Sequence, residues 1–485
     1  MPNNTIADNL QRLVDAKNDI ADAIVAKGGT VNEGDGLEEF PAAIDGIPTG
    51  SSDPYAKIVV HTEPDSSVTM TKVPIQLSVK ADIGSTVTIT NGAITYTRAA
   101  TGDYDNFQIP FGGDWIIQSD VNGSNKSIRE ITITELTLQI DLTHRVYGAF
   151  WTVGPDPKFT RTDSAKYFDD PTPYMSGLET YGSPFDNVYP WSDIEIVTLS
   201  DDVFVKIPKF YYRLIKTKTI MKFQISDYQH DSTWHVDPMH MNRSDGNGER
   251  TNAYISRYLI NSNGKSMSGQ TPYGSGATWV FNVIKSPHIP FDYQALVTVW
   301  FLYLVEFANW NCVSLIGGPA GSAYNTGRTD SMPYHTGTMG STRETTGVGV
   351  QYRYIEDLWN TNQHIDGMFS IKGYPYKLVT VPYKGGPNKD ICIPKYTSAQ
   401  QKYIVDWYVP SDDLYSWAMC PLTDSTGNIV ASVTNYSCGE IGSVFYTTSS
   451  YYVGYLSGNN ALFGINAISY DTSATNLYGR KIYLN

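Results

Sequence analysis

The first 50 residues carry apolar positions at helical spacing. Successive positions differ alternately by four and three residues, which is the heptad pattern of a helix that buries one stripe. Gly28 and Gly29 end the pattern, and a linker follows at 48–54. Such a helix packs either on its own domain or against copies of itself at a symmetry axis, and we expect the segment 1–50 to associate with copies of itself. The spacing is carried by Ile6, Leu10, Leu13, Lys17, Ile20 and Ile24.

Between residues 55 and 142 apolar and polar positions alternate, for example in IQLSV at 75–79 and TVTIT at 86–90. A period of two is typical of strands that bury one face. Turn pairs such as Asn91-Gly92 separate these runs, so we expect a small Ig-like β-sandwich of about seven short strands. The segment shows no catalytic cluster, and its predicted role is that of a spacer.

The remaining residues, 145–485, mix short strand patterns with long loops rich in Gly, Ser and Asn. One helix is predicted at 292–312, where YQALVTVWFLYLVEFANW is apolar on nearly every side. A helix without a polar face belongs in the centre of a large domain. The predicted fold class is therefore α+β, mostly β and loops: a short N-terminal helix, a β-sandwich and a large C-terminal domain.

The end of the chain has the composition of a recognition surface. From Asn435 to Asn485 it contains eight Tyr, seven Ser, six Asn and six Gly but only four charged residues. Tyr offers a rigid, amphipathic contact area, while Ser, Asn and Gly adapt their hydrogen bonds to a partner. We predict a binding face within about 433–480. Its candidate ligand-binding residues are Asn435, Tyr436, Tyr446, Tyr451, Tyr452, Tyr455, Asn459, Asn466, Tyr470 and Asn476.

Charge and targeting features limit the partners. A net charge of −14 disfavours nucleic acid, because phosphate binding needs clustered Lys and Arg. The start MPNNT lacks the features of a secretory signal, and the longest apolar run, 296–305, is too short to insert into a membrane. The four cysteines form no metal-binding or disulfide pattern and are expected to be buried thiols. They are Cys312, Cys392, Cys420 and Cys438.

Two parts of the chain resemble known families. Residues 10–47 resemble the N-terminal segment of tail and fibre proteins of phages and prophages that infect gut bacteria. Residues 145–485 resemble a C-type-lectin-like domain of the formylglycine-generating-enzyme type, found in phage receptor-binding proteins, some of them diversified by retroelements. The motifs are YGAFW at 147–151, FTRTD at 159–163, FDNVYPW at 185–191, VKIPKFYY at 205–212, YLVEFANWN at 303–311, YIEDLW at 354–359, IDG at 365–367 and LYGRKIY at 477–483.

This resemblance implies a homotrimer in the phage tail, made in the bacterial cytoplasm and assembled into the virion with other tail proteins. It also implies that the last 50 or so residues form the exposed ligand-binding face, and that Trp359, Gly479 and Arg480 belong to the scaffold. Calcium-dependent lectins have Trp-Asn-Asp at their sugar site, whereas Cys312 follows Trp310-Asn311 here. Calcium-mediated sugar binding is therefore not predicted, although a structural ion held by loop oxygens stays open. No cofactor, catalytic residue or metal-binding residue is assigned.

Features that suggest an enzyme also have simpler interpretations. His230, His235 and His240 lie among carboxylates, but spacing of five fits no ligand pattern, so hydrogen-bonded loop histidines are preferred to a metal site. The pairs Asp169-Asp170, Asp201-Asp202 and Asp412-Asp413 are interpreted as solvated turns, because neighbours on a strand point to opposite faces and form no catalytic dyad. Copper-binding oxidases of this fold use two cysteines closer together than Cys420 and Cys438.

The sequence thus predicts a non-enzymatic phage tail receptor-binding protein that adheres to a bacterial surface glycan or protein through its C-terminal face. Two alternatives stay open. One is a structural baseplate or fibre subunit without receptor contact, and the other is a hydrolase of envelope polysaccharide.

Overall fold

The computed structural model describes residues 15, 17–22, 24, 56–59, 69–72, 74–121, 125–153, 158–242, 248–274, 282–318, 324–359, 361–370, 378–380, 389–392, 402–411, 415–422, 431–432, 440–441, 452–456, 462–469 and 477–485. Strands make up most of its regular structure, which confirms the predicted mostly-β α+β class. Near the N-terminus, residues 17–22 are helical, as the heptad spacing predicts, and Ile24 is buried. A separate hairpin pairs β1 (Ala56–Val59) with β2 (Thr69–Lys72).

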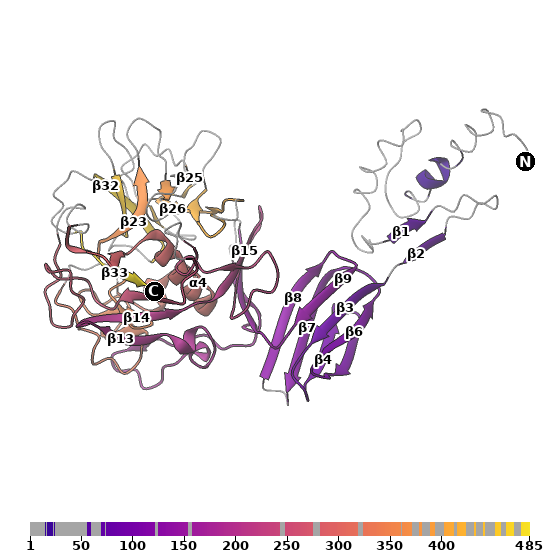
Figure 1. Cartoon of the computed structure of the whole chain (residues 1–485), viewed down its shortest axis with the longest axis horizontal. Coiled ribbons are helices and arrows are strands. Elements are labelled where there is room, and N and C mark those ends of the chain that lie inside the picture. The colour runs from indigo at the N-terminus through magenta and orange to yellow at the C-terminus, as the bar shows by residue number, and fades with distance from the viewer. Residues whose placement is uncertain are drawn as a thin grey trace, which may run out of the picture.

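Residues 75–141 form two sheets that enclose a hydrophobic core of their own (Figure 1). Inward positions such as Leu77, Ile89 and Trp115 are fully buried, while the positions between them are not. The run 131–140, ITITELTLQI, alternates as a single strand would, but it is interrupted at 134–136 and so contributes to two strands. The first sheet consists of β6 (Tyr104–Ile109), β3 (Ile75–Lys80) and β9 (Thr137–Asp141). The second consists of β5 (Thr95–Ala99), β4 (Thr86–Thr90), β7 (Gly113–Val121) and β8 (Asn125–Ile133).

The large C-terminal unit is built around helix α4 (Tyr293–Phe307). Asp292 caps its start by accepting a hydrogen bond from the Ala295 amide at 2.8 Å, and all 15 of its residues are buried, as predicted. The helix ends five residues before the predicted limit. Ala308 adopts a left-handed conformation with φ of 45°, and Asn311 then caps the short helix α5 (Cys312–Leu315).

Four sheets of the large unit surround this helix. One has the order β11 (Phe159–Asp163), β10 (Val146–Thr152), β16 (Ile220–Ser226), β15 (Tyr211–Lys216) and β17 (His235–Val236). The next has β13 (Glu195–Leu199), β14 (Asp202–Pro208), β18 (Asn252–Ser256), β33 (Lys481–Leu484) and β19 (His288–Pro290). A small third sheet has β12 (Tyr174–Met175), β20 (Gly337–Thr338), β21 (Val350–Tyr352) and β22 (Ile355–Glu356).

The fourth sheet has eight strands and contains most of the described C-terminal segments. Its order is β25 (Lys389–Cys392), β24 (Leu378–Thr380), β23 (Gln363–Ser370), β31 (Tyr452–Leu456), β32 (Gly464–Ser469), β30 (Glu440–Ile441), β26 (Lys402–Ile404) and β29 (Ala431–Ser432). The remaining elements are the pair β27 (Trp407–Tyr408) and β28 (Cys420–Pro421), and the 3₁₀ turns η1 (Pro184–Asn187) and η2 (Trp191–Asp193).

Buried polar contacts join the sandwich to the large unit. The Asp163 carboxylate, fully buried on β11, accepts the Glu130 amide of β8 at 3.0 Å and the Gln224 side-chain amide of β16 at 2.9 Å. Beside it, the Arg129 guanidinium of β8 donates to the His144 carbonyl and lies 2.9 Å from Nε2 of His230. Burial and the Arg129 charge lower the pKa of His230 to about 2, so its neutral ring is free to accept this hydrogen bond. The hydrogen bonds of Asp163 and Arg129 thus involve residues of both the sandwich and the large unit.

A buried ion pair fixes the end of α4. Glu306 is fully buried, and Arg353 binds it with both Nη2 at 2.5 Å and Nε at 3.1 Å. Ser183 and Tyr352 donate to the two carboxylate oxygens as well, at 2.9 and 3.0 Å. Arg353 also reaches Asp186 at 2.8 Å. The network therefore ties two segments that are distant in sequence, 183–186 and 352–353, to the central helix.

Removal of the Arg353 charge tests this network. Arg353→Met would leave the Glu306 carboxylate buried without its cation, and we expect a loss of about 3–5 kcal/mol in the free energy of unfolding by urea. Lys206→Met is the control, because Lys206 pairs with Glu195 at 2.9 Å at the surface and should cost less than about 1 kcal/mol. Equal losses in the two variants would contradict the importance of the buried pair.

Candidate functional site

The predicted binding segment contributes two adjacent strands to the middle of the eight-stranded sheet. β31 and β32 pair in antiparallel register, with Tyr455 opposite Asn466 and Tyr452 opposite Ser469. Figure 1 shows β23, β25, β26 and β32 gathered at one edge of the large unit, away from the sandwich. The structure therefore brings three of the ten predicted residues, Tyr452, Tyr455 and Asn466, onto neighbouring strands.

The backbone register places Tyr455 between two neighbouring strands. It pairs with Asn466 on β32 and with His364 on β23. The other seven lie outside the described residues: Asn435, Tyr436, Tyr446, Tyr451, Asn459, Tyr470 and Asn476.

Strand β23 connects this sheet to the interior. His364 is 1% exposed, and Ile365, the next residue, belongs to the large hydrophobic core. Burial lowers the pKa of His364 to about 4, because a charged imidazole would lose its hydration there. Both faces of β23 are therefore packed at this level. The strands that carry Tyr455 and Asn466 are attached to a rigid part of the domain.

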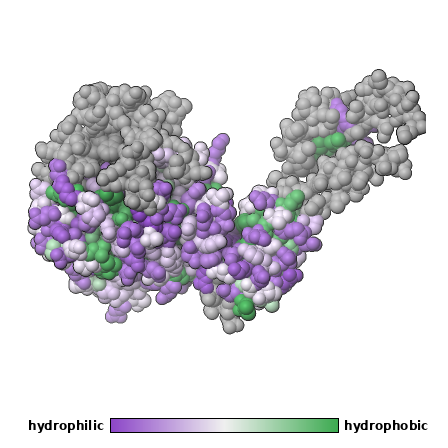
Figure 2. All heavy atoms as spheres, viewed as in Figure 1, coloured by the Kyte–Doolittle hydropathy of each residue, from purple (hydrophilic) through white to green (hydrophobic). Residues whose placement is uncertain are grey.

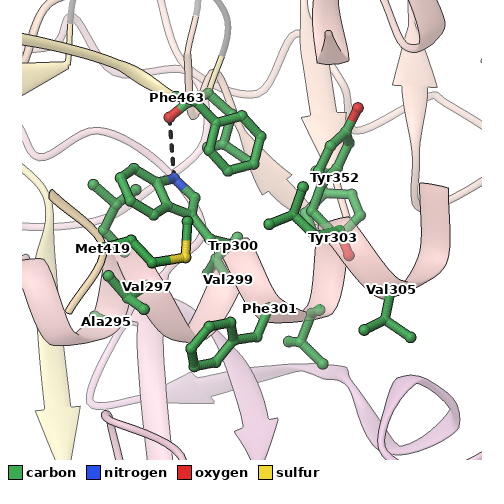
Figure 3. Close-up of a cluster of buried hydrophobic side chains, with 14 of the residues drawn as sticks. Ala295, Val297, Val299, Trp300, Phe301, Tyr303, Val305, Tyr352, Met419 and Phe463 are labelled. Carbon is green, nitrogen blue, oxygen red and sulfur yellow. Dashed lines mark hydrogen bonds between the residues drawn. The ribbon is translucent and has the colours of Figure 1, made fainter. Parts of the chain in front are cut away.

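Two residues between β31 and β32 are also fixed in the core. Leu462 and Phe463 are fully buried, although they lie in a segment rich in Gly, Ser and Asn. Figure 3 shows the Phe463 ring next to Trp300 and near Tyr303 of α4. The ring centroids of Phe463 and Trp310 are 4.9 Å apart with an interplanar angle of 84°. Burying a side chain as large as Phe contributes on the order of 2 kcal/mol.

The scaffold residues expected from the family resemblance are buried. Trp359 donates from Nε1 to the Gly317 carbonyl at 3.0 Å. Arg480 is fully buried and donates to Gln363 Oε1 on β23 at 3.0 Å and to the Glu356 carbonyl at 2.5 Å. The Arg480 guanidinium, directly before β33, thus links the end of the chain to β23, the strand that pairs with β31. Burial lowers the pKa of Arg480 to about 10, which still leaves it charged near neutral pH.

The histidines and carboxylates considered as catalytic candidates have structural contacts. His230 bonds to Ser226 of β16 at 2.8 Å, and buried His240 bonds through Nδ1 to Asp237, which agrees with histidines hydrogen-bonded within the domain, although His230 also bonds to Arg129 of the sandwich. His235 lies in β17 and not in a loop. Asp169, Asp170 and Asp201 are exposed, as expected for solvated turns, and Asp412-Asp413 lies outside the described residues.

Asp202 corrects one expectation. Its side chain is buried and pairs with Lys481 at 2.8 Å and Lys265 at 3.3 Å, so it is no solvated turn residue. It also accepts the Ser266 amide at 2.7 Å. Sequence reasoning missed this pair because Lys481 follows almost 280 positions later, and no local pattern connects them. The pairing of Glu306 with Arg353, 47 positions apart, was missed for the same reason. Cys312 and Cys420 are buried and form no disulfide within the described residues, as predicted, and Cys438 lies outside those residues.

No family model, curated protein or solved structure matched the chain. Within the part of the chain that the structure describes, no helix has both the length and the apolar character needed to cross a membrane.

The buried state of His364 predicts a pH dependence of stability. Its folded pKa of about 4 lies below the ordinary value of 6.5, so below pH 6.5 the unfolded chain binds a proton that the folded chain does not. The contribution of neutral His364 to the free energy of unfolding is complete above pH 6.5 and is lost as the pH falls from 6.5 towards 4. In His364→Gln the slope of unfolding free energy with pH over this range should decrease by about 1.4 kcal/mol per unit.

Ile365→Val is the matched packing control, since it shortens the neighbouring buried side chain without removing a titratable group. It should lower stability by about 0.5–1.5 kcal/mol at every pH and keep the wild-type slope. Urea denaturation at half-unit pH steps measures both slopes. An unchanged slope in His364→Gln would show that this ring titrates equally in the folded and unfolded chains.

Proposed function

We propose that this chain is a receptor-binding protein of a phage or prophage tail, which adheres to the bacterial surface through its C-terminal segment. The observation that supports this most is the pairing of Tyr455 with Asn466 at the centre of a sheet whose neighbouring strand β23 is packed on the core. A segment rich in Tyr, Ser and Asn is thus attached to a rigid scaffold. Rigid placement of aromatic and amide side chains reduces the entropy lost on binding.

The order of the parts supports the same function. The N-terminal segment attaches the chain to the particle and trimerises it, and the sandwich acts as a spacer. The large unit presents the eight-stranded sheet at an edge that the sandwich leaves uncovered in Figure 1. Weak single-site binding by Tyr stacking on sugar or packing on protein would be strengthened by the three copies of a trimer.

Binding in place of catalysis fits the described polar groups. The buried carboxylates Asp163, Asp202 and Glu306 accept hydrogen bonds or bind cations within the fold. Each of these groups therefore has a structural role in the fold. Retroelement diversification of the terminal segment is part of the proposal, because changes in loops between fixed strands would alter recognition and leave the core unchanged.

The test compares two sets of five Tyr→Ser substitutions in the full-length chain, labelled and bound to a panel of intact gut bacteria. The first set removes predicted contacts and should weaken strain-selective binding at least about tenfold, as loss of aromatic hot spots does. It consists of Tyr436, Tyr451, Tyr452, Tyr455 and Tyr470. The control set removes exposed tyrosines elsewhere and should leave binding unchanged. It consists of Tyr104, Tyr167, Tyr228, Tyr273 and Tyr324.

The alternatives give different results in the same assay. Equal binding by both variant sets, or no binding by the wild type, would reject the terminal segment as the binding face and favour a structural tail subunit. Release of soluble saccharide from the bacterial envelope would instead indicate a hydrolase. Circular dichroism of each variant shows whether lost binding reflects lost structure.

A further inference from the structure

The main chain of Leu462 is held by side chains from the centre of the domain. Its amide N–H donates to Sγ of Cys312, at the start of α5, over 3.0 Å. Its carbonyl accepts a hydrogen bond from Nε1 of Trp300, in the middle of α4, over 3.1 Å, drawn as the dashed line in Figure 3. Both contacts are buried, so water cannot replace them. Two core side chains thus satisfy both polar groups of one residue in the terminal segment.

The ring of the next residue makes the attachment directional. Phe463 contacts Trp300 and Tyr303, with ring centroids at 5.1 and 5.8 Å, and meets Trp310 edge-on. The two hydrogen bonds hold the Leu462 main chain against α4 and α5. The packing of the Phe463 ring then sets the direction in which the chain continues from this point. Strand β32 begins at Gly464, directly after this point.

Leu462 lies two residues before the start of β32, close to the register pairs of the hairpin. Residues 457–463 connect β31 to β32, and the two strands pair from Leu456 with Ile465 onwards. A shift of one residue in this pairing would move every side chain of a strand to the opposite face. Because the segment is rich in Gly, Ser and Asn, its own side chains specify the register weakly. The hydrogen bonds of Leu462 to Trp300 and Cys312 come from outside the hairpin and therefore add a constraint on the register of β31 with β32.

We propose that Trp300 and Cys312 are positioning residues that fix the register of the β31–β32 hairpin and so hold Tyr455 and Asn466 in place for binding. The expected effect on binding rests on the proposed receptor-binding function, whereas the expected effect on the hairpin register does not depend on that function. Of the two residues, Trp300 forms the stronger hydrogen bond to Leu462. Burial raises the pKa of the Cys312 thiol, which therefore stays protonated, and a neutral sulfur is a weak hydrogen-bond acceptor.

A neighbouring tryptophan provides a matched control. Trp407 is fully buried, as Trp300 is, and the two rings are 5.7 Å apart in the same core. Among the described residues, however, Nε1 of Trp407 has no hydrogen-bond partner. Trp300→Phe and Trp407→Phe therefore remove the same atoms from the same environment, and only the first removes the bond to Leu462.

The experiment measures hydrogen exchange of the β31 and β32 amides in the full-length chain, together with binding to the bacterial strain that the wild type recognises. Trp300→Phe leaves a buried carbonyl unsatisfied, so we expect exchange in these strands to accelerate roughly 5- to 150-fold relative to Trp407→Phe. Amides of the sandwich strands β3 and β7 should exchange equally in both variants. Binding should weaken in Trp300→Phe and stay near wild type in Trp407→Phe.

Equal exchange rates of β31 and β32 in the two variants would overturn the positioning role. Faster exchange throughout the large unit in Trp300→Phe alone would overturn it too, because that pattern indicates general destabilisation. If Trp300→Phe does not fold, Cys312→Ala with Cys312→Ser as its control applies the same comparison to the other hydrogen bond, because Ser keeps an acceptor at this position, and equal exchange would again overturn the proposal. If exchange changes as expected but the wild type binds no bacteria, the positioning role is supported and the proposed function fails.

Discussion

Helix α4 has no polar face, and this constraint organises the large unit. All 15 of its residues are buried, so the rest of the chain must cover it on every side. β10 and β16 pack against it from one sheet and β23 from another. The aromatic side chains of the helix extend the core to segments more than 100 positions away in sequence, such as Trp407 and Phe463. The fold is therefore closed by long-range packing more than by local pairing.

Polar groups inside this core select one arrangement among many possible ones. Apolar packing is non-directional, whereas an ion pair such as Glu306 with Arg353 is satisfied in only one geometry. Arg480 acts in the same way between the last strand and β23, and Asp163 does so between the large unit and the sandwich. Each removes a degree of freedom that hydrophobic burial leaves open. A rigid scaffold at the C-terminal sheet is the outcome.

A rigid scaffold separates the requirements of folding from those of recognition. The residues that hold the terminal segment, among them Leu462, Phe463 and Arg480, are buried. The candidate contacts Tyr455 and Asn466 lie on strands attached to them. If the terminal segment binds a bacterial receptor, its contacts can change with little effect on the core. The same separation explains how a segment so poor in Leu, Ile and Val can belong to a stable domain.

The sequence determined the local features of this protein, since these depend on neighbours along the chain. Alternation predicted the sandwich strands, apolar continuity predicted the buried helix, and composition singled out the C-terminal segment. Tertiary structure alone decided where α4 ends, which carboxylates are buried, and which strands lie beside β31. It also paired Tyr455 with Asn466, which composition cannot reveal because it carries no register. Partners such as Asp202 with Lys481 are joined by the packing of whole sheets, and no pattern of nearby residues encodes such a contact.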